Sequence, residues 1–183
     1  MRHTLIALLE DRPAAINRLL GLLRGRGLSV HSIAVGDSET PGVKRTTVLV
    51  DTDNVDQTMK QLNRLIEVLQ VTDVTHSQFV VRETALVKIE APEPRRAEIK
   101  AVAEGFGARM IGTGPESVVF EMTDTPARLG EMIARAQILG ACQTMRSGSL
   151  AMALGAAVPR EQPPIADDKA SGRPWWSQAD GVT

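Results

Sequence analysis

Strand-like runs and helix-like stripes follow one another along the chain in a single order, and that order occurs twice. The first half has two amphipathic helices, which begin near Pro13 and Val55. Four runs suited to strands surround these helices, at 4–9, 28–35, 44–50 and 68–75. The second half repeats this order between residues 84 and 146. Because each half has its own helix stripes to bury against its own sheet, we predict an α+β fold of two tandem βαββαβ domains.

Two local patterns predict details within the first half. The second helical stripe comprises Val55, Met59, Leu62 and Ile66, so we expect a helix that reaches Ile66. In the strand 28–35 the apolar positions change phase near His31 and Ser32, which predicts a β-bulge there.

The ends of the two repeats give the expected domain boundaries. We place the first domain at 1–78 and the second at 79–155. Beyond residue 155, prolines are scattered among polar and small residues without periodicity. We therefore expect 156–183 to be a disordered, mobile tail, and we assign no function to its Trp175 and Trp176.

Composition excludes several classes of partner. Aromatic residues make up only 3% of the chain, and the formal net charge is -1, so the chain lacks the stacking residues and the basic field of a nucleic-acid-binding protein. The first residues run into a short apolar strand and not into a signal peptide or a spanning helix. We predict a cytoplasmic protein with no nucleic-acid and no membrane partner. Its single cysteine, Cys142, is expected to be a small buried residue.

Residues that could carry catalysis are sparse. His3, His31 and His76 are far apart in the sequence and lack the spacing or a nearby acidic partner expected of a metal site. The glycine pairs at 105–107 and 112–114 do not extend to a phosphate-binding pattern, and no serine lies in a nucleophile-elbow context. We therefore expect no active site, no metal site and no bound cofactor in this chain.

The loop from Glu10 to Ala15 joins the first strand to the first helix. A helix start offers free backbone N–H groups and the positive end of a dipole, which suit a carboxylate, while Glu10 or Asp11 could accept the ammonium group of an amino acid. The alternative is structural: Asp11 caps the helix and Pro13 starts it. The residues alone favour this structural alternative.

Other proteins with this order of elements carry different residues. An RNA-recognition domain has aromatic stacking residues on its central strands, and the runs 4–9 and 44–50 have none. A metal chaperone has a cysteine pair in its first loop, where this chain has Glu10, Asp11, Arg12 and Pro13. Both classes are disfavoured.

Many residues along 1–155 resemble the acetolactate synthase small subunit in order and spacing. In the first half these are Leu9, Glu10, Pro13 to Ile16, Arg18, Gly21, Leu22, Arg26, Gly27, Ser32, Arg45, Gln61 and Leu62. In the second half they are Arg82, Glu83, the run 86–89, and Arg146, Ser147 and Gly148. The resemblance implies two tandem ferredoxin-like domains, the first an ACT domain, and a homodimer formed by ACT domains side by side.

The resemblance also implies a regulatory function. Such a chain activates a separate large catalytic subunit, which uses thiamine diphosphate, Mg and FAD to form acetolactate in valine, leucine and isoleucine biosynthesis. It also mediates feedback by valine or a related amino acid. The alternative is a stand-alone ACT-type sensor that binds another protein.

The family's functional positions carry over to particular residues of this chain. The implied effector site combines Asp11, Pro13, Ala14, Ala15 and Ile16 of one chain with Ser29, Val30 and His31 of its neighbour. Gln57 and Gln61 match a region that contacts the catalytic subunit.

Three residues depart from the family at the effector site. The family usually has Asn at the position of Asp11, Gly at that of Ala14 and Asn at that of Ser29. These changes add a charge, add a methyl group and shorten a polar side chain. We expect valine feedback to be weakened or altered, with activation retained.

Two further segments resemble the effector loop, and we predict that both are structural. Asp124, Pro126, Ala127 and Leu129 echo its residues but follow the third strand of their domain. The loop from Glu90 to Arg95 lies at the equivalent place in the second domain, but its two prolines give no clear ligand geometry.

Overall fold

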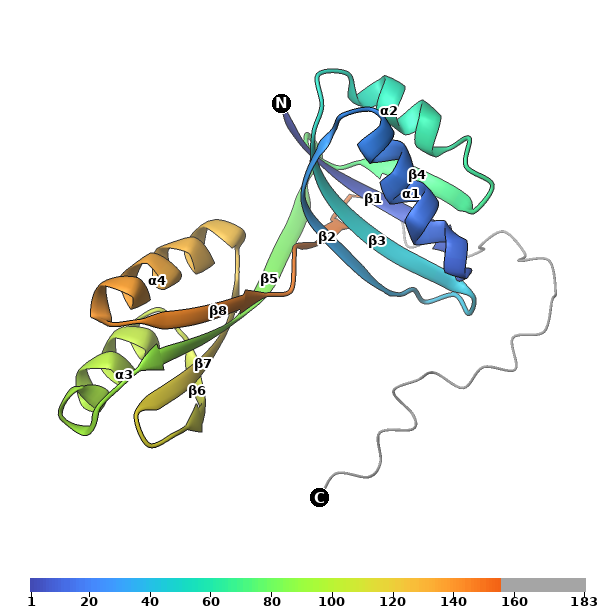
Figure 1. Ribbon diagram of the computed structural model, residues 1–183. Coiled ribbons are helices and arrows are strands. Elements are labelled where there is room, and N and C mark those ends of the chain that lie inside the picture. The colour runs from blue at the N-terminus through green and yellow to red at the C-terminus, as the bar shows by residue number, and fades with distance from the viewer. Residues whose placement is uncertain (156–183) are drawn as a thin grey trace.

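The computed structural model describes residues 1–155, so the expected tail at 156–183, with Trp175 and Trp176, lies outside the described residues. Two α+β units follow each other along the chain, each an antiparallel sheet with two helices against one of its faces (Figure 1). The predicted fold class, two tandem βαββαβ ferredoxin-like domains, is confirmed.

The first unit is a four-stranded sheet with the order β2-β3-β1-β4. Its elements are β1 (Arg2–Glu10), α1 (Pro13–Gly25), β2 (Ser29–Asp37), β3 (Val43–Asp51), α2 (Val55–Leu62) and β4 (Val68–Asp73). Alternate strand residues Leu5, Ala7 and Leu9 face the helices and pack against Leu19 and Leu23 of α1. The other face of this sheet is therefore left for contacts with the rest of the chain.

One local prediction for this unit is confirmed and one is wrong. The pairing of β2 with β3 shifts between Val30 and Ser32, which is the bulge expected at His31. Helix α2 ends at Leu62, however, and Ile66 is 81% exposed. Two tight turns follow the helix, in which Leu65 donates to the carbonyl of Leu62 and Val68 to that of Leu65, both at 3.0 Å. These turns bring Leu65 to the core in place of Ile66.

The second unit has a main sheet with the order β6-β7-β5-β8. Its elements are β5 (Phe79–Glu90), a short 3-10 turn η1 (Glu93–Arg95), α3 (Arg96–Gly105), β6 (Arg109–Thr113), β7 (Ser117–Asp124), α4 (Pro126–Leu139), β8 (Cys142–Arg146) and β9 (Leu150–Ala153). Phe120 and Ile99 lie in its fully buried core. Cys142 packs against this core but is only partly buried, so the expectation of a buried cysteine is corrected: it lies on the edge strand β8.

Strand β5 extends from one unit into the other, as Figure 1 shows. Its last residues belong to the second sheet, whereas Phe79 to Arg82 pair with β9, a strand that the sequence analysis did not predict. Ala151 of β9 and Phe79 pack against Ile6 and Val74 of the first unit. The β5–β9 ribbon thus covers part of the sheet face that the helices of the first unit leave open.

Candidate functional site

The predicted effector loop lies at the end of β1, where two backbone hydrogen bonds fix it. The N–H of Glu10 donates to the carbonyl of Glu67 at 2.8 Å, and the N–H of Asp11 donates to the carbonyl of Gly42 at 2.8 Å. The first bond ties the loop to the turn before β4, and the second ties it to the connection between β2 and β3. The backbone is therefore held in place where α1 begins.

The first turn of α1 has no side-chain cap. Arg12 occupies the cap position in an extended conformation without a capping hydrogen bond, and Pro13 follows it. The N–H of Ala15 donates to the carbonyl of Arg12 at 3.0 Å, but that of Ala14 has no partner among the described residues. Asp11 is therefore not the cap, which corrects one half of the structural alternative, whereas Pro13 does start the helix as that alternative predicted. The positive end of α1 is open to an anionic group such as a carboxylate.

Both acidic side chains of the loop lie beside cations. Asp11 Oδ2 is 3.4 Å from Lys44 Nζ, and Glu10 Oε2 is 2.7 Å from Arg12 Nε. Lys44 also contacts Asp37; this hydrogen bond, with the charge of Asp11, raises the pKa of Lys44 against the opposing effect of its partial burial. Lys44 therefore stays positively charged and offsets the negative charge that Asp11 brings to the loop.

Ser29, Val30 and His31 lie at the opposite end of the first sheet. Ser29 pairs with Asp51, which also pairs with Arg2 at the start of β1. The loop lies at the other end of β1, and the nine residues of this strand span roughly 27 Å. The structure does not bring the two groups of predicted effector residues together within one chain.

His31 forms a small charged cluster at its end of the sheet. His31 Nε2 is 2.5 Å from Asp51 Oδ2, and an Arg2 guanidinium nitrogen is 3.5 Å from the same imidazole nitrogen. The hydrogen bond from His31, with the charges of His31 and Arg2, holds the pKa of Asp51 below its usual value despite some desolvation. His31 thus has an acidic partner that the sequence spacing did not reveal.

The outer edge of β2 is unpaired among the described residues, because β2 is the first strand in the order of its sheet. Val30 and Val35 on this strand are 37% and 40% exposed. An edge strand with exposed apolar side chains is a surface onto which another strand can pair.

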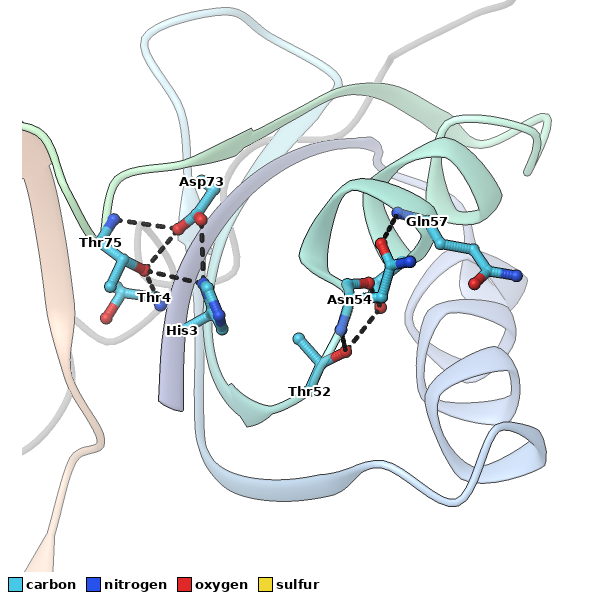
Figure 2. Close-up of polar contacts among 8 residues, drawn as sticks. His3, Thr4, Thr52, Asn54, Gln57, Asp73 and Thr75 are labelled. Carbon is cyan, nitrogen blue, oxygen red and sulfur yellow. Dashed lines mark hydrogen bonds and ion pairs between the residues drawn. The ribbon is translucent and has the colours of Figure 1, made fainter. Parts of the chain in front are cut away.

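Gln57 and Gln61 are one turn apart on α2. The N–H of Gln57 donates to Asn54 Oδ1 at 3.0 Å, which caps the helix, and the Gln57 side chain points away from this cap (Figure 2). Gln57 is exposed and Gln61 is half-buried, and neither side-chain amide has a partner in the part of the chain that the structure describes. Both amides are free to contact another protein.

The loop from Glu90 to Arg95 in the second unit is filled by an arginine side chain. Arg96 Nε donates to the carbonyl of Ala91 at 3.0 Å, and its NH2 group donates to the carbonyls of Gly114, at 2.8 Å, and Pro115. The segment that echoes the effector loop, at the start of α4, is capped by Thr125, whose hydroxyl accepts the N–H of Arg128 at 3.3 Å. Thr125 therefore occupies a helix N–H at the start of α4, and the Arg96 side chain occupies backbone carbonyls at the loop before α3.

The junction between the two units depends on Arg146, Ser147 and Gly148. Arg146 forms two hydrogen bonds to the carboxylate of Glu83, at 2.8 and 2.7 Å, and Glu83 is 5% exposed. Gly148 has a φ of 80°, and the next residue, Ser149, donates its N–H to Ser32 Oγ of the first unit at 3.0 Å. The sequence analysis named Arg146, Ser147 and Gly148 only for their resemblance to the family. Their packing role follows from the structure.

A second polar cluster surrounds His3, which is buried at the end of the first sheet opposite the loop. His3 Nδ1 is 3.0 Å from Asp73 Oδ2, and Thr75 donates to the other oxygen of Asp73 (Figure 2). Burial raises the pKa of Asp73, but the hydrogen bonds from Thr75 and His3 outweigh it, so this pKa lies below its usual value.

No group of three or more possible metal ligands occurs within residues 1–155. No helix in the same range is long and apolar enough to cross a membrane.

The class of the protein follows from the first unit, a βαββαβ domain with an open helix start. Residues 5–70 match the family model described as "AHAS small subunit-like ACT domain", so this unit is a domain of the ACT class. Residues 82–155 match the model described as "Small subunit of acetolactate synthase". The chain belongs to the acetolactate synthase small-subunit family.

Relatives and a solved structure agree with this assignment over most of the chain. The acetolactate synthase small subunit of Bacillus subtilis is 34% identical over 158 residues, which cover 85% of this chain and 92% of the relative. That of Mycolicibacterium smegmatis is 32% identical over 155 residues, covering 84% and 91%. The crystal structure of the small subunit from Thermotoga maritima superposes with a TM-score of 0.78 at 28% identity, covering 86% of this chain and 99% of that one.

Proposed function

We propose that this chain is the regulatory subunit of acetolactate synthase, which activates a separate large catalytic subunit and mediates feedback by an amino acid. The observation that carries this proposal is that both units, and not the ACT unit alone, match the small-subunit family. In this proposal the chain serves valine, leucine and isoleucine biosynthesis.

The chemistry of acetolactate formation belongs to the catalytic subunit in this proposal. Thiamine diphosphate, Mg and FAD are expected on that subunit, and this chain acts on the reaction only through binding. Gln57 and Gln61 are the proposed contact, because both have side-chain amides on one side of α2 that no other residue of 1–155 binds. Such amides can exchange water for hydrogen bonds with a partner at little cost.

A homodimer through the β2 edges accounts for the separation of the effector residues. If two β2 strands pair antiparallel about a two-fold axis, the Ser29 end of one chain lies beside the Asp37 end of the other. Asp37 pairs with Lys44, which contacts the loop at Asp11, so the Asp37 end is also the loop end. The proposed site therefore combines the open start of α1 from one chain with Ser29, Val30 and His31 from its neighbour.

The proposed effector is a small amino acid of the valine type. Its carboxylate would meet the N–H of Ala14 at the start of α1, which no other described residue accepts. The Ala14 methyl group reduces the space there, and Ser29 offers a shorter polar group than Asn. Lys44 partly offsets the charge of Asp11. We expect valine to act weakly and the activation of the catalytic subunit to persist.

The test is to mix the purified chain with its cognate catalytic subunit and to measure acetolactate formation with and without valine. We expect a several-fold stimulation, lost in the double variant Gln57→Ala, Gln61→Ala and kept in the control Gln70→Ala, which removes an exposed glutamine on β4. Calorimetry with valine on the unmodified chain and on Asp11→Asn tests the effector site, and we expect tighter binding by the variant. The absence of stimulation, with amino-acid binding retained, would indicate a stand-alone sensor instead.

A further inference from the structure

A cavity of about 300 Å³ lies between the first sheet and the β5–β9 ribbon. Gly36 and Thr47 line it from β2 and β3, while Val80, Leu150 and Met152 line it from the ribbon. Sites for small molecules begin at about this size. The cavity lies on the sheet face opposite α1, because the ribbon packs on Ile6 and not on the helix-facing residues.

Large apolar side chains of the ribbon line this cavity and stay partly uncovered by the other residues of 1–155. Val80, Leu150 and Met152 are 38%, 59% and 62% exposed, which is high for large apolar residues on a ribbon that packs against a sheet. The hydroxyl of Thr47 accepts the N–H of Ala151 at 3.3 Å, so it already has a hydrogen-bond partner within the protein. A Cβ added at Gly36 would meet no atom within 4 Å, which shows open space beside the backbone.

One cation at the cavity has no acidic partner within residues 1–155. The guanidinium of Arg45 is bound to both carboxylate oxygens of Glu39, at 2.9 and 3.1 Å, and Asp37 is bound to Lys44. Arg82, in contrast, donates only to the carbonyl of Val81 at 2.8 Å and forms no ion pair with any residue that the structure describes. Arg82 is also among the residues shared in order and spacing with the family, and neither the loop nor the junction uses its charge.

We propose that this cavity binds a small carboxylate with an apolar chain, the carboxylate on Arg82 and the chain against Val80, Leu150 and Met152. A guanidinium can bind a carboxylate through two parallel hydrogen bonds, and the apolar walls supply the remaining affinity. The ligand touches β2 and β3 of the first unit and the ribbon that leads to the second. This site is separate from the effector loop and does not depend on the proposed function.

The test uses the full chain with labelled methyl groups and isovalerate as the probe. We expect saturable shifts of the methyl signals of Val80, Leu150, Ala151 and Met152, with a Kd of about 1 mM, as is typical of a ligand with few atoms. Arg82→Ala should weaken binding about tenfold or more, as should replacement of the probe by uncharged isovaleramide. Arg135→Ala, which removes an exposed arginine on α4 without an ion pair in the described part, is the matched control.

A variant that fills the cavity tests whether the methyl shifts come from binding at this site. Gly36→Leu places a side chain in the open space and should abolish the shifts while the chain stays folded. A parallel titration with L-leucine shows whether the cavity binds a free amino acid more tightly than a simple carboxylic acid. Shifts confined to Ala14 and Ala15, equal binding of the amide, or no shift up to about 20 mM would overturn the proposal. Shifts of the cavity methyls only upon addition of the catalytic subunit would do the same, because they would make this surface a protein contact.

Discussion

Two loops at equivalent positions in the two units are built in opposite ways. Each connects the first strand of its unit to the first helix. Neither α1 nor α3 has a side-chain cap, but in the first unit the N–H of Ala14 is unpaired among the described residues. In the second unit Arg96 fills the loop and donates to the carbonyls of Ala91, Gly114 and Pro115. One βαββαβ plan thus gives one loop that can receive a ligand and one that is closed by its own side chain.

The difference between the loops shows where the polar groups of each unit are used. In the second unit the arginines hold backbone and carboxylate groups inside the structure, as Arg96 and Arg146 do. In the first unit Arg18 likewise pairs with the buried Glu67, but Asp11 and Arg12 are exposed beside the start of α1. We therefore expect variants of the second unit to affect stability and variants of the first loop to affect binding.

The largest effect on stability is expected at the junction. Arg146→Ala leaves the buried carboxylate of Glu83 without its partner, which should lower the free energy of unfolding by about 3 kcal/mol. Urea unfolding measures this loss. The double variant Arg146→Ala, Glu83→Gln removes the unpaired charge and should recover part of it. An unchanged unfolding midpoint for Arg146→Ala would show that this pair between β5 and β8 contributes little to stability.

The direct test of the two loops compares one arginine from each. Arg96→Ala removes the donors to three carbonyls and should cost about 2 kcal/mol of stability. Arg12→Ala removes one pair between the exposed Arg12 and the half-buried Glu10 and should cost less, about 0.5–1 kcal/mol. Thermal or urea unfolding of both variants gives the two values. Equal losses would contradict the difference between a closed and an open loop.

The contact of Gly148 with the first unit predicts an intermediate effect. A Cβ there would lie 2.9 Å from Ser32 Oγ and 3.1 Å from the carbonyl oxygen of Ile33, in a backbone with φ of 80°. Gly148→Ala should therefore cost about 1–2 kcal/mol and loosen the junction, as hydrogen exchange at Ser149 would show. Gly130→Ala, within α4 and with no atom near the added Cβ, is the control and should stabilise by about 0.5–1 kcal/mol. A loss no larger at Gly148 than at Gly130 would count against the junction.

The smallest expected effect is the loss of stability at low pH. The folded-state pKa of Asp73 lies below its ordinary value of 3.8, so its contribution to stability is present above that value and is lost as the pH falls through the folded-state pKa. We expect a loss below about 1 kcal/mol, measured by urea unfolding at a series of pH values below about 4. Asp73→Asn should remove this part of the pH dependence. A variant with an unchanged pH profile would show that other carboxylates account for the acid sensitivity.

The sequence predicted those features that depend on local periodicity. The order of elements follows from the helix stripes, and the bulge at His31 follows from the change of phase in one strand. Strand β9 and the long β5 were missed because they exist only through their pairing and their contact with Ile6 and Val74. The false extension of α2 to Ile66 arose because Leu65 takes the buried position after a turn.

The sequence predicted where the candidate loop lies in the fold but not the contacts that its residues make. The position of the loop between β1 and α1 follows from the sequence, and the resemblance adds Ser29, Val30 and His31 from the neighbour. The ion pair between Asp11 and Lys44 joins residues 33 positions apart, and the filling of the second loop depends on how Arg96 folds back onto Gly114. Such contacts depend on the tertiary structure, so sequence spacing cannot reveal them.

The most direct test of the open first loop is to follow backbone amide and arginine Nε signals of the labelled chain as valine, leucine or isoleucine is added. We predict that one of these amino acids shifts the Ala14 amide and the His31 amide saturably, while the Arg96 Nε signal in the second loop stays unchanged. The contrary result is a saturable shift at Arg96 with the Ala14 amide unmoved, which would place effector binding in the loop that the structure shows to be filled.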